Sequence, residues 1–178
     1  MRIALSGIAG SGKDYFADFL VKKYKFTKMA FADGTRKVTH QLFPQIQEHY
    51  EPFEKEQKLT HLGIDKTPRE IWIELSETIR KVDNDYFVKM LDDRIKMTHV
   101  ENILVTDLRD INEFYYLKDN GFTIIEIIPE KIIYEPNEYD KRILKFNHMI
   151  TNKFHNDFNG TQKFENYLMN EVLKGTRV

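Results

Sequence analysis

The stretch Gly7-Ile-Ala-Gly-Ser-Gly-Lys13-Asp14 decides the fold of this chain. It follows a short apolar run at residues 2–6 that is typical of a buried strand, and apolar positions recur at helical spacing through residues 13–24. Glycines let successive backbone N–H groups turn inward around phosphate oxygens, and the start of a helix adds partial positive charge. The stretch therefore predicts a phosphate-binding loop. A purely structural glycine-rich turn is the alternative, but the strand before it and the helix after it favour the phosphate loop.

One lysine and two aspartates, Lys13, Asp14 and Asp107, are the candidates to bind nucleotide phosphates and their metal ion. Lys13 is expected to reach the β and γ phosphates of a nucleotide. Asp14 stands where Ser or Thr is usual, and its carboxylate can hold Mg²⁺ directly or through a water. Asp107 closes an apolar strand at 103–107, so in a parallel sheet it would face the same crevice as the loop. A simple strand-terminating aspartate is the alternative. We expect ATP as phosphoryl donor, with Mg²⁺ near Asp14 and Asp107.

Arginines in the middle of the chain suggest a second anion site. Arg69 falls in the first turn of a helix that Thr67 caps, where the helix dipole disfavours a cation and a bound anion would remove the conflict. Arg36 is expected at a similar place, at the start of the preceding helix. Arg80 ends its helix, where positive charge is favourable anyway. Trp72, the single tryptophan, stacks on a base or belongs to the core, and its helical spacing favours the core.

One further arginine, Arg109, and one charged segment, residues 129–147, have two interpretations each. Arg109 either projects into the crevice towards an anion or pairs with a neighbouring carboxylate on the surface. The charged segment 129–147 either closes over the phosphates or is a solvated loop. Within it, Arg142 is the first candidate because its fork can hold two phosphate oxygens, and Lys141 and Lys145 come after it.

Composition excludes several classes of function. The 178 residues include 27 Lys and Arg against 28 Asp and Glu, which argues against a partner that is a nucleic acid polymer. The absence of cysteine excludes disulfides, thiolate metal sites and a cysteine nucleophile. The six histidines have no metal-ligand spacing. No apolar run approaches the length of a membrane span, and the first strand starts without a signal peptide. We expect a soluble cytoplasmic protein with no membrane partner.

The order of elements predicts the fold class. Strands are expected at residues 2–6, 28–31, 103–107, 122–128 and 148–150, with helices between them and a terminal helix at 162–174. A polar turn is expected at 32–34, and an all-helical stretch at about 33–100 interrupts the alternation. Alternating strands and helices predict an α/β fold with a parallel sheet in a single domain, residues 1–178.

At this point the chain resembles a known family, the deoxynucleoside monophosphate kinases of bacteriophages, within the P-loop nucleotide kinases. Each matching motif is short, but their order and spacing are specific over most of residues 1–128. The Gly-Lys-Asp ending of the loop belongs to this pattern. The matching stretches are residues 6–14, Phe31-Ala-Asp33, Thr67-Pro-Arg-Glu70, Arg80 to Phe87 and Asp107-Leu-Arg109.

The resemblance implies a three-layer fold with a five-stranded parallel sheet in the order 2-3-1-4-5. It also implies a helical monophosphate-binding insertion at about 33–100 and a short lid at about 129–147. The implied reaction moves the γ-phosphoryl group of ATP·Mg²⁺ to a deoxynucleoside monophosphate. Members are often homodimers, and a phage-encoded member would work in the host cytoplasm.

Our hypothesis assigns each candidate residue a role. The donor phosphates are bound by Gly10, Ser11, Gly12, Lys13, Asp14 and Tyr15. The acceptor is bound by Asp33, Arg36, Arg69, Trp72, Arg80 and Arg109. Lys13, Asp14 and Arg142 act on the transferred group. The alternatives are a P-loop kinase of another phosphorylated metabolite, such as phosphomevalonate, and a non-catalytic ATP-binding switch.

Overall fold

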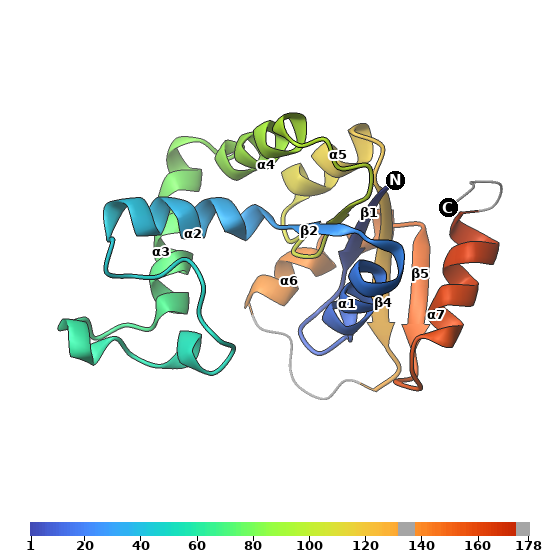
Figure 1. Cartoon of the computed structure of the whole chain (residues 1–178), viewed down its shortest axis with the longest axis horizontal. Helices are drawn as coiled ribbons and strands as arrows, with labels where there is room; N and C mark the ends of the chain where they lie inside the picture. Colours follow the sequence, from blue (N-terminus) through green and yellow to red (C-terminus); the bar gives the residue numbers. More distant parts are fainter. Residues whose placement is uncertain (132–137, 174–178) are drawn as a thin grey trace. The chain divides into compact units, whose positions relative to one another are not determined.

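The computed structural model describes residues 1–131 and 138–173, with the side chains of 138 and 139 left out (Figure 1). The chain divides into two compact units. Unit 1 comprises Met1–Met29 and His99–Val178, and unit 2 comprises Ala30–Thr98. Unit 2 therefore covers nearly the same residues as the expected helical insertion. In the described part of the chain, no helix is both long enough and apolar enough to cross a membrane.

Unit 1 is built on a five-stranded sheet in which every pairing is parallel. The strand order is β2-β3-β1-β4-β5, which confirms the α/β fold expected from the sequence and the strand order that the resemblance implies. The central strand β1 pairs Ala4 with Val105 on one side and with Ile124 on the other. The strands are β1 Arg2–Ser6, β2 Thr27–Met29, β3 Ile103–Val105, β4 Thr123–Pro129 and β5 Asn152–Asn156.

The helices of unit 1 cover both faces of this sheet. Parallel crossovers are right-handed, and β1 to β2 runs in the opposite direction along the sheet from β3 to β4, so α1 and α5 lie on opposite faces. On the α1 face the Phe16 ring stacks 4.4 Å from Phe164 of α7 and lies 5.4 Å from Phe154 of β5. These helices are α1 Lys13–Tyr24, α5 Ile111–Asp119, α6 Glu138–Leu144 and α7 Gln162–Tyr167, which a π-helical turn at Leu168–Val172 continues.

Unit 2 consists of helices and 3₁₀ turns joined by loops, with no strand in residues 30–98. Thr67 caps α3 by accepting a hydrogen bond from the Glu70 N–H at 3.1 Å, and the Glu70 carboxylate accepts one from the Thr67 N–H at 2.8 Å, as the sequence predicts. Gly34 lets α2 and α4 approach closely, because a Cβ there would lie 3.0 Å from Met90 Sδ. Its helices are α2 Phe31–Leu42, α3 Pro68–Val82 and α4 Tyr86–Met97, with 3₁₀ turns η1 Glu54–Glu56 and η2 Thr60–Leu62.

The polar turn predicted at residues 32–34 is wrong. The second strand ends at Met29 and α2 begins at Phe31. The Asp33 carboxylate accepts a hydrogen bond from the Ala30 N–H at 3.0 Å, so a residue typical of turns stabilises the start of a helix instead. Arg36 therefore lies in the second turn of α2 and not at its start.

Two predictions in the C-terminal third are also wrong. Residues 129–147 contain α6, although the sequence suggested an irregular segment; residues 132–137 of this segment fall outside the described residues. The strand expected at 148–150 is a 3₁₀ turn, η3 Asn147–Met149, and the final strand lies at Asn152–Asn156. That strand is at the edge of the sheet and is mostly polar, so it lacks an apolar run.

Candidate functional site

The glycine-rich loop begins where β1 ends, and its path depends on glycine at two points. Gly7 has φ +151° and Gly12 has φ +89°. A Cβ on Gly7 would lie 2.6 Å from Ser11 Oγ and 2.7 Å from the Ile127 carbonyl oxygen. A Cβ on Gly12 would lie 2.3 Å from Asn156 Nδ2. The loop is therefore folded tightly against β4 and β5, and neither glycine tolerates a side chain.

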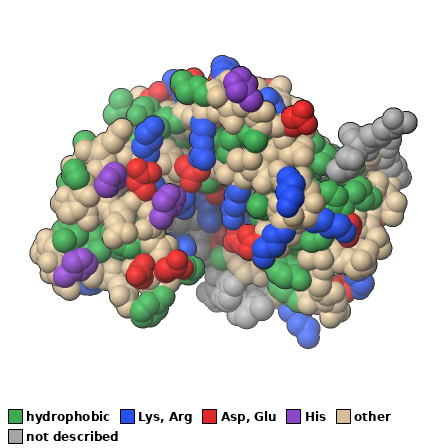
Figure 2. Space-filling view, in the orientation of Figure 1, with side chains coloured by type: hydrophobic (Ala, Val, Ile, Leu, Met, Phe, Trp, Pro, Cys, Tyr) green, Lys and Arg blue, Asp and Glu red, His purple; other side chains and the backbone are tan. Residues whose placement is uncertain are grey.

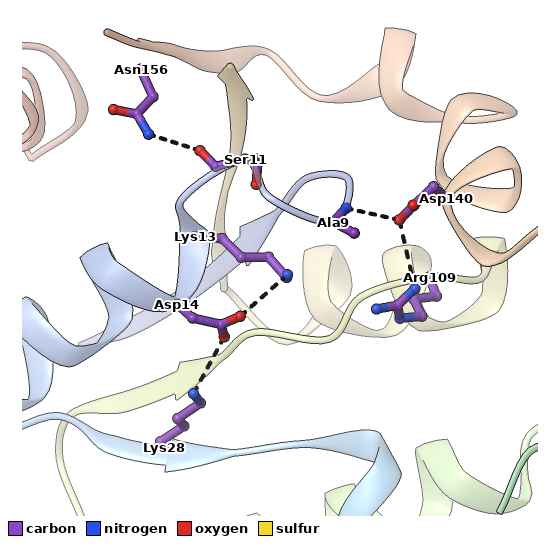
Figure 3. A network of polar contacts seen from close by, with 8 residues as sticks. All are labelled: Ala9, Ser11, Lys13, Asp14, Lys28, Arg109, Asp140 and Asn156. Atoms are coloured by element: carbon purple, nitrogen blue, oxygen red, sulfur yellow. Dashed lines mark hydrogen bonds and ion pairs between the residues drawn. The ribbon is translucent and has the colours of Figure 1, made fainter. Parts of the chain in front are cut away.

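The start of α1 offers donors for an anion. Gly12 is the N-cap and has no side chain with which to cap the helix, so the first-turn N–H groups from Lys13 to Tyr15 are left for another acceptor. The Lys13 side chain is 12% exposed, and its Nζ lies 3.5 Å from Asp14 Oδ2 (Figure 3). Uncapped helix N–H groups and a neighbouring lysine are the kinds of donor that bind phosphate at the start of a helix.

Asp14 lies between two lysines. Its Oδ2 faces Lys13, and its Oδ1 lies 3.5 Å from Nζ of Lys28 in β2 (Figure 3). The Asp14 side chain is 68% exposed, so its oxygens are open to a ligand. Lys28 was not predicted from the sequence. The only available signal was that its strand is parallel to the others and ends at the same edge as the loop.

Two buried polar side chains from the last third of the chain hold the loop. Asn156 at the end of β5 donates from Nδ2 to the Ser11 carbonyl oxygen at 2.8 Å. Asp140 of α6 accepts a hydrogen bond from the Ala9 N–H at 3.0 Å (Figure 3). Asn156 is 2% exposed and Asp140 is 1% exposed. Neither residue was singled out from the sequence.

The segment after β3 contributes Asp107 and Arg109. Asp107 is half-buried and lies two residues beyond the end of β3. The Arg109 N–H donates to Glu113 Oε2 at 2.8 Å, which fixes the backbone of this segment. Its guanidinium lies 3.8 Å from Asp140 Oδ1, so Arg109 belongs to the same network as the phosphate loop (Figure 3).

Arg142 of α6 also faces the segment after β3. Its Nη1 lies 3.5 Å from Asp110 Oδ1. The two ion pairs between these segments are therefore reciprocal, because each segment supplies one arginine and one carboxylate. Arg142 lies in unit 1 together with the loop, and its action on a transferred phosphoryl group stays a prediction.

The loop following β5 lies beside Gly12. A Cβ on Gly12 would lie 3.7 Å from the ring of Phe158, which has φ +61° and is 46% exposed. Asp157 begins this loop. A hydrogen bond from Lys163, helped by the Asn159 N–H, lowers the pKa of Asp157 to about 2. The carboxylate is therefore ionised at neutral pH and ties the loop to α7.

The acidic residues of unit 1 fit a metal that arrives with a nucleotide. Among the described residues, no group of three or more histidine, aspartate and glutamate side chains is placed to hold an ion by itself. Mg²⁺ that is bound with nucleotide phosphates needs only one or two carboxylates, and its other ligands are phosphate oxygens and waters. The exposed carboxylate of Asp14 and the half-buried Asp107 supply oxygen donors of that kind.

Unit 2 has a charged cavity of its own, of about 230 Å³, between α2, α4 and the segment that contains residues 48 and 49. Of the predicted acceptor residues, it includes Asp33 and Arg36. On the face drawn in Figure 2, acidic side chains lie beside lysines and arginines. The ionisable residues that line the cavity are Asp33, Arg36, Lys37, Glu48, His49 and Arg94.

Asp33 organises the arginines of this cavity. Its Oδ1 lies 2.9 Å from Arg36 Nη1, and its Oδ2 lies 2.5 Å from Arg94 Nη1. The Arg36 guanidinium also lies over the Trp72 ring, 5.4 Å from its centroid, so one face of the indole is covered. Arg94 was missed from the sequence, because it comes from α4, 61 residues after Asp33.

The other two predicted arginines of unit 2 have local partners. Arg69 Nη1 lies 2.6 Å from Glu56 Oε1, so a carboxylate supplies the negative charge that the sequence argument expected from a ligand. Arg80 Nη1 lies 3.7 Å from Glu77 Oε1, and its guanidinium lies 5.2 Å from the centre of the Phe87 ring. Neither arginine lines the described cavity of unit 2.

No protein-family model matches the chain, and a search of curated proteins finds no significant relative.

Proposed function

We propose that this protein transfers the γ-phosphoryl group of ATP to a nucleoside or deoxynucleoside monophosphate and releases ADP and the nucleoside diphosphate. The observation that carries the proposal is the phosphate loop. It follows a central parallel strand, depends on glycine at Gly7 and Gly12, and presents Lys13 together with an uncapped helix start. The second support is the cavity of unit 2, in which arginines and a lysine outnumber the carboxylates.

On the donor side, the loop amides and Lys13 bind the β and γ phosphates. The Lys13 ammonium neutralises the charge that moves onto the leaving oxygen as the bond to the γ-phosphorus breaks. Arg109 and Arg142 are close enough to the loop network to add positive charge. An acceptor phosphate is already an anionic nucleophile, so the reaction needs no covalent intermediate and no strong base.

The carboxylates of Asp14 and Asp107 would hold Mg²⁺ together with the phosphates of ATP. When bound, the ion supplies positive charge that shields the donor phosphates. Lys13 and Lys28 flank Asp14 and keep its carboxylate paired in the absence of nucleotide.

On the acceptor side, the cavity of unit 2 would bind the monophosphate. Arg36 and Arg94 present two guanidinium groups at one carboxylate, and such forks match phosphate oxygens in the same way. Lys37 and His49 add further donors at the cavity wall. Trp72 is available for a base only on the side that Arg36 does not cover.

The test is ADP formation from ATP in the presence and absence of an acceptor. The acceptor panel contains each deoxynucleoside and ribonucleoside monophosphate, with phosphomevalonate included. We expect ADP release to rise at least a hundredfold with one or more nucleotides. Turnover with phosphomevalonate alone would assign the protein to a different kinase class. ATP binding with no acceptor-dependent turnover would indicate a non-catalytic switch.

Two lysines of α1 give a matched pair of variants. Lys13→Ala is expected to abolish transfer, because the charge on the leaving phosphate is no longer neutralised. Lys22→Ala removes an exposed lysine of the same helix and should leave turnover within about twofold. Equal activity of the two variants would contradict the role of the loop.

A further inference from the structure

Asp140 is a buried carboxylate that contacts two groups of the donor site, the Ala9 N–H and the Arg109 guanidinium. One of its oxygens, Oδ1, accepts the Ala9 N–H at 3.0 Å and lies 3.8 Å from the Arg109 guanidinium (Figure 3). Its side chain is 2% exposed. A buried charge is costly unless it is paired and hydrogen-bonded. Simple packing of α6 on the sheet needs no carboxylate at this position, so its contacts call for an explanation in terms of the loop.

The position of the contact on the loop is informative. Asn156 holds the second half of the loop through the Ser11 carbonyl oxygen, and Asp140 holds the first half through the Ala9 N–H. Among the described contacts, Asp140 gives the first half of the loop a side-chain hydrogen bond in addition to the packing of Gly7 against β4. A carboxylate beside a phosphate site repels phosphate unless a cation neutralises it, and Arg109 lies on the same oxygen.

We propose that Asp140 is a positioning residue of the donor site: it fixes the phosphate loop through the Ala9 N–H and orients the Arg109 guanidinium towards the donor phosphates. The part that concerns Arg109 rests on the proposed phosphoryl transfer. The part that concerns the loop does not, because it is a property of the protein without nucleotide.

The experiment separates these two parts with two substitutions. Asp140→Asn keeps an oxygen that can accept the Ala9 N–H but removes the charge that faces Arg109. Asp140→Ala removes both. Glu165→Gln is the matched control, because it neutralises another carboxylate of unit 1 with 15% side-chain exposure, which pairs with Lys23 and Tyr24.

The first measurement is amide hydrogen exchange over residues 7–12 without nucleotide. We expect exchange in Asp140→Ala to be at least tenfold faster than in the wild type. Exchange in Asp140→Asn and Glu165→Gln should stay within about threefold of the wild type. Unchanged exchange in Asp140→Ala would overturn the proposal, because the carboxylate would then serve only the packing of α6.

The second measurement is ATP affinity and turnover in the same proteins. Asp140→Ala should weaken ATP binding about tenfold, whereas Asp140→Asn should bind ATP within about threefold of the wild type but lower kcat at least tenfold. Equal kcat for Asp140→Asn and the wild type would refute the role of Arg109 orientation. A wild-type protein without acceptor-dependent turnover would refute the proposed function, and the exchange measurement would still decide the role of Asp140 in the loop.

Discussion

Replacing Gly12 by alanine tests whether the loop is held by its contact with Asn156. Gly12 has φ +89°, and an added Cβ would lie 2.3 Å from Asn156 Nδ2. Gly160 provides a matched control, because it has φ +83° in the same unit and nothing lies within 4 Å of an added Cβ. Both substitutions force alanine into the left-handed region, but only Gly12→Ala displaces a neighbour.

The expected magnitudes follow from these contacts. The left-handed conformation costs a non-glycine residue roughly 1–2 kcal/mol, and this is all that Gly160→Ala should lose. Gly12→Ala must also break the buried bond from Asn156 to the Ser11 carbonyl oxygen, which is 2.8 Å long. Leaving a buried acceptor unsatisfied costs about 1–3 kcal/mol. The free energy of unfolding should therefore fall by about 2–5 kcal/mol in Gly12→Ala.

The assay is urea unfolding with two probes. Trp72 is the only tryptophan and lies in unit 2, so its fluorescence reports that unit, whereas far-ultraviolet circular dichroism reports both units. We expect Gly12→Ala to lower the urea concentration at which unit 1 unfolds. This change should be visible in the circular dichroism and absent from the Trp72 fluorescence.

A double-mutant cycle makes the reasoning refutable. In an Asn156→Ala background the clash is absent, so Gly12→Ala should cost only the roughly 1–2 kcal/mol of its backbone conformation. The coupling free energy between the two substitutions should reach about 1 kcal/mol or more. A cost for Gly12→Ala that equals the cost of Gly160→Ala, or that is the same in both backgrounds, would show that Asn156 does not hold the loop.

Three further predictions concern other parts of the chain. Thr67→Ala removes the side-chain cap of α3 and should destabilise unit 2 by about 1 kcal/mol, measured by Trp72 fluorescence, whereas Thr67→Ser should restore most of the loss. If Arg69 binds the acceptor, Arg69→Ala should raise the acceptor KM at least tenfold and Glu56→Gln should not. An unchanged KM in Arg69→Ala would show that Arg69 only forms its ion pair with Glu56. Because the pKa of Asp157 is lowered to about 2, its stabilising contribution is complete above pH 4 and disappears as the pH falls towards 2. The difference in unfolding free energy between the wild type and Asp157→Asn should therefore shrink over that range, and a difference that persists at pH 2 would contradict the assignment.

The features that the sequence predicts well are those that short stretches determine. The apolar runs of β1 and β4, the glycine pattern of the loop and the capping box at Thr67 each depend on residues within a few positions of one another. The last strand, Asn152–Asn156, escaped prediction because only Phe154 and Asn156 are buried. Edge strands of this kind have no apolar run, so local patterns do not mark them.

The residues that the sequence missed are those that tertiary contacts select. Asp140 and Asn156 contact the loop from 131 and 145 residues away. An aspartate in a charged helix and an asparagine at the end of a polar strand look like surface residues until the topology places them. Arg94 belongs to the same class, because α4 must pack on α2 before it can reach Asp33.

The carboxylates of both units explain why composition gave no sign of a basic site. Most lysines and arginines of the two candidate sites are paired with acids in the absence of ligand, and the chain as a whole has a net charge of −1 although these sites are rich in cations. A phosphate group competes well for such partners, because it is multiply charged and accepts paired hydrogen bonds from guanidinium forks. Binding would then exchange one anion for another at these pairs. This arrangement suits a protein that binds single nucleotides, and it differs from the open basic surface that binds a nucleic acid polymer. The pairs that support this argument are Lys13–Asp14, Lys28–Asp14, Arg109–Asp140, Arg142–Asp110, Arg36–Asp33 and Arg94–Asp33.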